Sequence, residues 1–217
     1  CPMTIRVCCG GDVGGGLYHS QINEQWFFSQ PGLIVVMPAT PYDAKGLLKS
    51  AIRGEDPVIF FEHKRLYRWI KEELPPDDFV VPIGKAAVRK TGKDITIVSY
   101  GLMYHRSLEA VNQLEKEGIS EELIDMRTLL PWDRETIFES IKKTSRVVLV
   151  QENSKTGGVM AEVAASISEE IFDYLDAPVG RVCGLDVPML PFAPPLEHFF
   201  LPNTEKIVRA VKKVLEY

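Results

Sequence analysis

The stretch LIVVMPATPYDAKGLLKSAIRGEDPVIFF, residues 33–61, decides the fold class. It begins with a continuous apolar run of strand length that stops at a proline, and a second such run follows Pro57. Between the two runs, Thr40 and Pro41 are typical of a helix start, apolar residues follow at helical spacing, and Gly54 supplies the stop. A helix that joins two buried strands through short connections predicts a parallel βαβ unit.

The same alternation of strands and helices extends in both directions from this stretch. Before it, a short strand and a short helix with an aromatic face are expected at residues 3–7 and 23–30. After it, the expected strands cover residues 95–99, 123–126, 146–150 and 179–183, and the helices between them begin at Gly101, Asp133, Gly158 and Thr204. This pattern predicts an α/β fold with an open, mostly parallel sheet that helices cover on both faces.

A change of character separates the chain into two domains. From His63 to about Gly92 the sequence is charged and contains prolines, which is typical of a boundary between domains. The predicted organisation is a first domain at residues 1–70, a linker at 71–92 and a second domain at 93–217.

Composition limits the functional classes. A net charge of −5 without a basic stripe argues against nucleic-acid binding, and the sequence holds no apolar run of about 18 residues that would span a membrane. The four cysteines show no metal-binding spacing, which is typical of a reducing compartment. Because the chain begins with Cys1 instead of methionine, we expect that a segment upstream has been removed.

The sequence most suggestive of chemistry is the glycine-rich stretch at residues 8–21. Residues 10–16 hold five glycines, which allow positive φ values and close backbone approach, and a single histidine, His19, follows them. The stretch matches neither common phosphate-binding fingerprint. On these residues alone, His19 is either an ordinary polar residue after a turn or a group placed for proton transfer.

Several longer motifs resemble the β subunits of thiamine diphosphate-dependent 2-oxo acid dehydrogenases. They are the glycine-rich run with Leu17–Gln21, Pro31–Val36, Asp43–Leu48, Asp125–Asp133, Thr156–Gly158 and Asp176–Gly184. The resemblance covers the whole chain. It implies part of a thiamine pyrimidine-binding domain, with a parallel sheet and helices on both sides, followed by a transketolase C-terminal-like α/β domain.

The resemblance also implies an activity and its partners. Such subunits form α2β2 heterotetramers in which thiamine diphosphate lies between subunits, with its diphosphate and Mg²⁺ held mainly by the α subunit. The enzyme is an oxidoreductase that decarboxylates a 2-oxo acid and transfers the acyl group to lipoamide on the acyltransferase core of a multienzyme complex. His19 takes the place of the active-site histidine, which positions or protonates intermediates. No cofactor-binding side chain is assigned in this chain.

The resemblance favours a substrate class but leaves alternatives. Tyr18 and residues 62–68 are more similar to branched-chain members, so a branched 2-oxo acid such as 2-oxoisovalerate is expected, with pyruvate or acetoin as alternatives. A transketolase or deoxyxylulose-phosphate synthase is the rival enzyme. The second rival is a non-catalytic docking module for the acyltransferase, formed by residues 93–217. In that case Glu197, Glu205 and Glu216 could offer negative charge to a basic partner.

One departure from the family concerns activity. The family glutamate that hydrogen-bonds the cofactor's aminopyrimidine ring would lie upstream of Cys1, so we expect this polypeptide alone to be inactive. The expected location is the cytoplasm if the source is bacterial and the mitochondrial matrix if it is eukaryotic.

The resemblance further implies a structural monovalent cation, usually K⁺, held largely by backbone carbonyls. The matching positions are Cys1, Met3, Thr4, Ala51, Gly54 and Asp56. For the remaining candidates, ordinary roles are expected. His63, His105 and His198 are expected to be plain polar or core residues, and Glu152 is expected to interact with the helix start that follows it.

Overall fold

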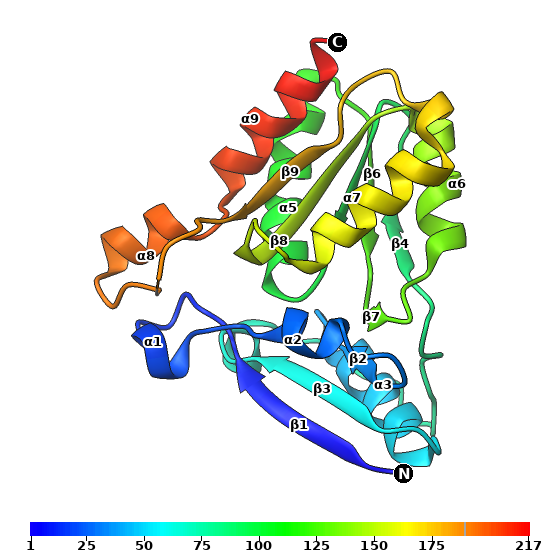
Figure 1. Cartoon of the computed structure of the whole chain (residues 1–217), viewed down its shortest axis with the longest axis vertical. Coiled ribbons are helices and arrows are strands. Elements are labelled where there is room, and N and C mark those ends of the chain that lie inside the picture. Colours follow the sequence, from blue (N-terminus) through cyan, green and yellow to red (C-terminus); the bar gives the residue numbers. More distant parts are fainter. Residues whose placement is uncertain (189) are drawn as a thin grey trace.

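Two sheets, each accompanied by helices, make up the computed structural model, which describes residues 1–188 and 190–217 (Figure 1). The first unit is built on a sheet of order β1-β3-β2-β7. Its strands are β1 (Thr4–Cys9), β2 (Ile34–Val36), β3 (Val58–His63) and β7 (Thr128–Leu130). The accompanying helices are α1 (Gly16–His19), α2 (Glu24–Phe28), α3 (Pro41–Arg53) and α4 (Leu66–Trp69).

The βαβ prediction is confirmed in the first unit. Strands β2 and β3 are parallel, with Ile34 opposite Val58, and α3 connects them. The Thr40 hydroxyl oxygen accepts a hydrogen bond from the Asp43 backbone N–H at 3.2 Å, which satisfies one of the free donors at the start of α3. The helix ends at Gly54, as its sequence indicates.

The second unit is built on a five-stranded sheet of order β4-β6-β5-β8-β9. Its strands are β4 (Ala87–Lys90), β5 (Ile95–Ser99), β6 (Glu121–Asp125), β8 (Val147–Ser154) and β9 (Gly180–Gly184). All pairs are parallel except β4 with β6. Strand β4 lies among residues 71–92, which the sequence analysis assigned to the linker. Its four residues, AVRK, carry little apolar signal, because it is a partly exposed edge strand.

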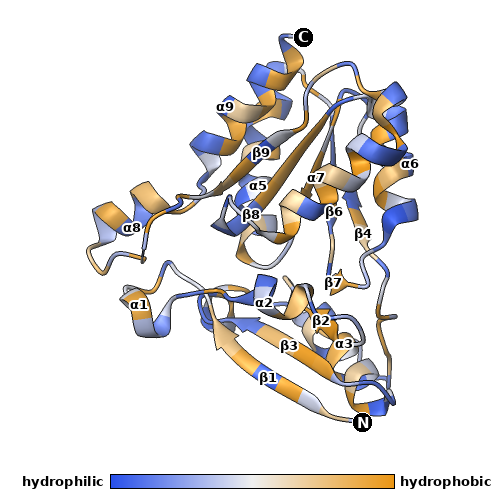
Figure 2. Ribbon diagram, in the orientation of Figure 1, coloured by the Kyte–Doolittle hydropathy of each residue, from blue (hydrophilic) through white to orange (hydrophobic). Residues whose placement is uncertain are grey.

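Helices cover both faces of the second sheet. They are α5 (Leu102–Leu114), α6 (Arg134–Thr144), α7 (Val159–Glu170) and α9 (Thr204–Leu215), with short 3₁₀ turns at Glu115–Glu117 and Phe172–Tyr174. A further helix, α8 (Pro194–Phe200), projects away from the sheet (Figure 1). Apolar side chains of α5 and α9 pack on one face, and those of α6 and α7 pack on the other. Figure 2 shows hydrophobic residues along β8 and β9, whereas the helices carry both hydrophobic and hydrophilic residues. The expected doubly covered sheet is therefore confirmed for this unit.

The start of the last helix differs from the sequence prediction. Asn203, not Thr204, is the N-cap residue, since its side-chain oxygen accepts a hydrogen bond from the Lys206 N–H at 3.0 Å. Thr204 is the first helical residue, and its hydroxyl donates to Glu109 at 2.6 Å. Asparagine and threonine are both good capping residues, so only the local geometry distinguishes them.

The two units share backbone pairing and core. Strand β7 comes from the second half of the chain but pairs antiparallel with β2, with Val35 opposite Leu130. One buried cluster includes Val35 and Phe61 of the first unit together with Tyr100 and Leu149 of the second. Among the described residues, no helix has both the length and the apolar character needed to cross a bilayer.

Candidate functional site

The glycine-rich stretch forms a loop between β1 and α1, and His19 is the last residue of α1. Gly10 has a φ of +99°, and a Cβ atom at this position would overlap the imidazole ring of His63. Gly16 has a φ of +57°, and a Cβ there would overlap the ring of Phe192. Glycine is therefore required at these two positions both by the backbone conformation and by the close approach of a ring.

His19 lies on a pocket of about 460 Å³. Its other walls include the aromatic rings of Trp26, Phe27 and Phe61, and Cys8 and Cys9 from the end of β1. The His19 side chain is exposed, while its backbone carbonyl accepts a hydrogen bond from the Lys64 ammonium group. The structure thus presents a solvent-accessible imidazole at the rim of a pocket lined by both apolar and polar groups, where it can exchange a proton with a bound molecule.

Glu152 holds the start of the loop. One of its oxygens accepts a hydrogen bond from the Gly11 backbone N–H at 2.6 Å, and the other lies 2.7 Å from Nε2 of His63. His63 is fully buried, and its Nδ1 accepts a hydrogen bond from the Arg65 N–H at 3.2 Å. Because Nδ1 accepts, the bonding partners assign the ring proton to Nε2, which donates to Glu152. A carboxylate of the second unit therefore binds both the loop and β3 of the first.

These contacts correct the expectation for Glu152. Gln151, not Glu152, interacts with the start of α7, since its side-chain oxygen accepts a hydrogen bond from the Met160 N–H at 2.7 Å. His63 is buried as a core residue, but its pairing with Glu152 was not expected. The two residues lie 89 positions apart, so no local pattern in the sequence connects them.

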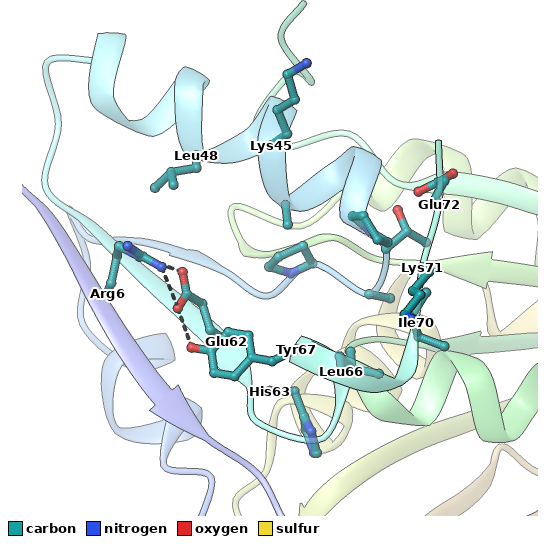
Figure 3. A pocket seen from close by; sticks show the side chains of 15 residues that line it. Arg6, Lys45, Leu48, Glu62, His63, Leu66, Tyr67, Ile70, Lys71 and Glu72 are labelled. Carbon is teal, nitrogen blue, oxygen red and sulfur yellow. Dashed lines mark hydrogen bonds and ion pairs between the residues drawn. The ribbon is translucent and has the colours of Figure 1, made fainter. Parts of the chain in front are cut away.

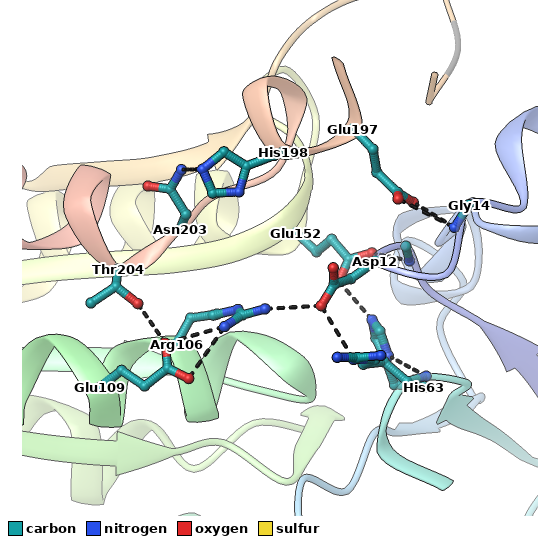
Figure 4. A network of polar contacts seen from close by, with 12 residues as sticks. Asp12, Gly14, His63, Arg106, Glu109, Glu152, Glu197, His198, Asn203 and Thr204 are labelled. Atoms are coloured by element: carbon teal, nitrogen blue, oxygen red, sulfur yellow. Dashed lines mark hydrogen bonds and ion pairs between the residues drawn. The ribbon is translucent and has the colours of Figure 1, made fainter. Parts of the chain in front are cut away.

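Two further carboxylates hold the loop (Figure 4). Asp12 forms an ion pair with Arg106 of α5 at 2.9 Å. The backbone N–H of Gly14 donates to Glu197 of α8 at 3.2 Å. Glu197 is buried, so it is a loop anchor instead of an exposed docking charge. Contacts from β8, α5 and α8 thus fix the loop that carries His19, and all three elements belong to the second unit.

A second buried carboxyl group lies just after the loop. Glu24 accepts a hydrogen bond from the Tyr100 hydroxyl at 2.7 Å and one from the Asn153 side-chain amide at 3.1 Å. Burial raises the pKa of Glu24 from 4.5 to about 7. These bonds also connect α2 of the first unit with β8 and with the residue that follows β5 in the second unit.

The segment that carries the branched-chain prediction is divided between two cavities. Lys64 lines the pocket of His19, whereas Glu62 and Tyr67 line a separate cavity of about 520 Å³ beside α3 and α4 (Figure 3). There the Arg6 guanidinium donates two hydrogen bonds to Glu62, at 2.6 and 3.0 Å, and the Tyr67 hydroxyl donates a third at 2.5 Å. The Glu62 carboxylate therefore has its hydrogen-bond donors within the wall of this cavity.

The remaining histidines have ordinary surroundings. His105 lies 2.7 Å from the Ala39 carbonyl through Nε2, and His198 lies 3.1 Å from the Asn203 side-chain nitrogen. Neither residue lines the pocket of His19.

The six positions expected to hold a monovalent cation lie at the start of β1 and around the connection from α3 to β3. Two of the carbonyls already accept backbone hydrogen bonds, Met3 from Val58 at 2.8 Å and Ala51 from Gly54 at 3.3 Å. Within the described residues, no group of three or more His, Cys, Asp or Glu side chains is arranged to hold a metal ion. The cation remains a prediction.

Comparisons with protein families match nearly the whole chain. Residues 1–70 match the transketolase pyrimidine-binding domain, and residues 84–207 match the transketolase C-terminal domain. The chain is 53% identical to 2-oxoisovalerate dehydrogenase subunit beta of Bacillus subtilis over 100% of its own length and 66% of the relative's. It is 50% identical to the mitochondrial subunit of the same name from Dictyostelium discoideum, over 99% and 58%.

Pyruvate dehydrogenase E1 component subunit beta of Bacillus subtilis is 45% identical, over 100% of this chain and 66% of the relative. The chain thus spans about two thirds or less of the length of these relatives.

Solved structures give the same fold. A split-gene transketolase, described as an inactive β4 tetramer, superposes with a TM-score of 0.81 and 33% identity over 98% of this chain and 66% of that one. A transketolase mutant from Pichia stipitis superposes with a TM-score of 0.66 over 99% of this chain and 30% of that one; at 17% identity it supports the fold alone.

Proposed function

Because the chain belongs to the family that combines a transketolase pyrimidine-binding domain with a transketolase C-terminal domain, we propose that it acts in the β subunit of the decarboxylating component of a 2-oxo acid dehydrogenase complex. Identity of 53% along the whole chain to a subunit of that kind supports the proposal. The single observation that carries it is the exposed imidazole of His19 at the rim of a pocket with aromatic side chains in its walls, next to a loop that the second unit holds in place.

The proposed cofactor is thiamine diphosphate, which when bound supplies an electron sink for the decarboxylation. The pocket beside His19 is compatible with an organic ring system, because its volume is about 460 Å³ and its walls include the aromatic rings of Trp26, Phe27 and Phe61. Mg²⁺ prefers carboxylate and phosphate oxygens as ligands, and no group of three or more His, Cys, Asp or Glu side chains among the described residues is arranged to hold a metal ion. We propose that the α subunit holds the diphosphate and its Mg²⁺.

The contribution of this chain is proton transfer and positioning. A ring nitrogen of His19 gives a proton to, or takes one from, the group that reacts in the pocket. Lys64 fixes the backbone of His19 through its carbonyl, and Glu152 fixes the loop through Gly11. With its backbone held, the imidazole needs only a side-chain rotation to meet the substrate, which lowers the entropic cost of reaching the reactive geometry.

The proposed substrate is a branched-chain 2-oxo acid such as 2-oxoisovalerate. Identity is higher to two subunits with that substrate in their names, 53% and 50%, than to the pyruvate-type subunit, 45%. The acyl product would pass to lipoamide on the acyltransferase core, and the assembly would be an α2β2 heterotetramer. Carbonyl groups at Cys1, Met3, Thr4, Ala51, Gly54 and Asp56 are proposed to hold K⁺ in this assembly.

The test uses a hybrid subunit. Residues 1–217 of this chain replace the matching segment of the Bacillus subtilis 2-oxoisovalerate dehydrogenase subunit beta, and the hybrid is assembled with the α subunit from that bacterium. We expect decarboxylation of 2-oxoisovalerate that requires thiamine diphosphate. We expect His19→Ala to lower kcat by about 100-fold or more, because general acid–base catalysis contributes that much.

His198→Ala is the matched control, since this histidine lies outside the pocket, and it should change kcat less than about twofold. A hybrid that assembles but decarboxylates neither 2-oxoisovalerate nor pyruvate nor acetoin would contradict the proposal. Turnover of sugar phosphates by the same hybrid would instead favour a transketolase, which the 33% identity to the split-gene transketolase makes the second candidate.

A further inference from the structure

A second groove lies between β9 and α9, outside the site described above. Its volume is about 430 Å³. Strand β9 and the loop after it form one wall, α9 forms the other, and Lys155 lies at one end. None of the residues that line it lines the pocket of His19.

Positive charge is concentrated in this groove although the chain as a whole carries a net charge of −5. The wall residues include five cations, Lys155, Arg181, Lys206, Arg209 and Lys213, and one acid, Asp186. Hydrogen bonds from the Thr156 N–H at 3.0 Å and the Thr156 hydroxyl at 2.7 Å lower the pKa of Asp186 and satisfy its oxygens. One carboxylate cannot neutralise five cations, so the groove attracts anions.

Two of these cations already have structural partners. The Lys206 ammonium group donates to the carbonyls of Phe199 at 2.5 Å and Leu201 at 2.8 Å, so it closes the connection from α8 to α9. Arg181 donates to the Lys155 carbonyl at 3.3 Å, which holds β9 against the end of β8. Their positive charge adds to the electrostatic potential of the groove, although some of their N–H groups already donate hydrogen bonds to backbone carbonyls.

The other three cations are unpaired. Within the described part of the chain, Lys155, Arg209 and Lys213 have no carboxylate oxygen within 4.0 Å. Lys212, the neighbour of Lys213 on α9, contrasts with these three cations, because it forms an ion pair with Glu117 at 2.6 Å. Three cations without a carboxylate partner in one groove form a positive surface that an anionic partner would complement.

The shape of the groove favours a linear anion. Lys206, Arg209 and Lys213 are spaced i, i+3, i+7, so they lie on one side of α9 over a length of about 10 Å. Opposite them, β9 is the outermost strand of its sheet and pairs only with β8 among the described strands. An outermost strand has backbone donors and acceptors free along its outer edge, and these can pair with another extended chain.

We propose that this groove binds an extended acidic segment of a partner protein, which adds to the sheet alongside β9. Its backbone pairs with the edge of β9, and its carboxylates meet Lys155, Arg209 and Lys213. Alternate side chains of the segment rest on Val182 and Ala210, which form apolar parts of the wall. This site goes beyond the proposed function and does not depend on it.

The test measures binding of a fluorescent heptapeptide of alternating glutamate and valine to the full chain by anisotropy. We expect the double variant Arg209→Gln/Lys213→Gln to bind about tenfold more weakly or worse. The matched control is Lys116→Gln/Lys212→Gln, which removes the same charge outside the groove, one cation from the 3₁₀ turn after α5 and one from α9, and should change affinity less than about twofold. Circular dichroism of each variant checks the fold.

Two further probes separate strand addition from simple charge attraction. A peptide of the same sequence with a methyl group on every backbone nitrogen has no donor for the edge of β9, so it should bind about tenfold more weakly. Inorganic triphosphate should displace the heptapeptide only at far higher concentration. Equal binding of the N-methylated peptide, displacement by triphosphate at matching concentration, equal loss in the control variant, or no binding by wild type would each overturn the proposal. His19→Ala should leave peptide binding unchanged.

Discussion

Glu152 joins the two units through both of its carboxylate oxygens. One oxygen binds Gly11 of the loop and the other binds His63 of β3, and all three groups are buried. Water cannot replace the lost acceptor of a buried donor. The Gly11 N–H and the His63 Nε2–H therefore both depend on the Glu152 side chain for a hydrogen-bond acceptor.

Replacement of Glu152 by alanine should therefore destabilise the chain by roughly 3 kcal/mol, because two buried donors are left unsatisfied at about 1–3 kcal/mol each. Urea unfolding of the full chain measures this change. Hydrogen exchange at the amides of residues 11–16 should also accelerate, since the loop loses its anchor. Glu162→Ala, an exposed position on α7, is the control and should change stability by less than about 0.5 kcal/mol.

Glu24 makes stability depend on pH. Its pKa is raised from 4.5 to about 7 in the folded chain because the carboxyl group is fully buried. Below about pH 4.5 it is protonated in both states, so folding carries no penalty. As the pH rises toward 7 the unfolded state loses the proton first, and stability falls until the folded state also ionises.

The variant Glu24→Gln mimics the protonated form and should not have this dependence. Between pH 4.5 and pH 7.5, wild type should lose roughly 3 kcal/mol relative to the variant, since one pKa unit is worth about 1.4 kcal/mol. Urea unfolding of both proteins across this range measures the difference between their free energies of unfolding. Other titrating groups such as Asp125 are present in both proteins, so their contributions cancel in this difference. A difference that stays constant with pH would contradict the assignment.

At the scale of secondary-structure elements, the start of α3 illustrates how a local signal becomes structure. The Thr40 hydroxyl accepts from the Asp43 N–H at 3.2 Å and donates to the Asp43 carboxylate at 2.9 Å. It thereby both caps α3 and orients a buried carboxylate that contacts the second unit.

Replacement of Thr40 by alanine should destabilise the chain by about 1 kcal/mol, the usual cost of a lost N-cap, with a further loss from the freed Asp43 oxygen. Thr40→Ser keeps the hydroxyl and should restore most of the stability. Thermal unfolding of the two variants beside wild type gives the comparison. Equal destabilisation by serine and alanine would show that the methyl group, not the cap, is responsible.

At the scale of the whole molecule, four charged side chains connect α3 with the second sheet. Asp43 forms ion pairs with Arg89 of β4 and with Arg127 at 2.9 Å, and Arg89 also pairs with Asp125 of β6 at 3.0 Å. Asp43 and Asp125 are fully buried. Burial raises the pKa of Asp125 to about 6, against the lowering effect of Arg89. The four residues thus form one interdependent cluster between the units.

Arg89→Met should destabilise the chain by about 3–5 kcal/mol, because it leaves buried carboxylates without their main cation. The two units should also separate more readily, which limited proteolysis within residues 71–86 would detect. Arg134→Met removes an exposed arginine that pairs with Glu170, and it should change stability by less than about 1 kcal/mol. Equal effects of the two variants in urea unfolding would contradict the role given to the cluster.

The elements that sequence alone predicted have strong local signals. The apolar runs of β2, β3, β5 and β8 and the caps Thr40 and Asp133 all depend on neighbouring residues, and each is found as predicted. The strands that sequence analysis missed, β4 and β7, are short and carry weak periodicity. They are strands because each finds a partner distant in the sequence, β6 for β4 and β2 for β7.

The same division holds for the candidate site. The glycines of the loop, the histidine that follows them and the family motifs are contiguous, so the sequence by itself determined the fold class, the family and His19 as the residue of interest. Only the tertiary structure decided what holds that loop, the pairing of Glu152 with His63, the burial of Glu24 and the unpaired cations between β9 and α9. The physical reason is that burial and charge pairing depend on residues that folding brings together from distant positions, and these distances leave no periodic trace in the chain.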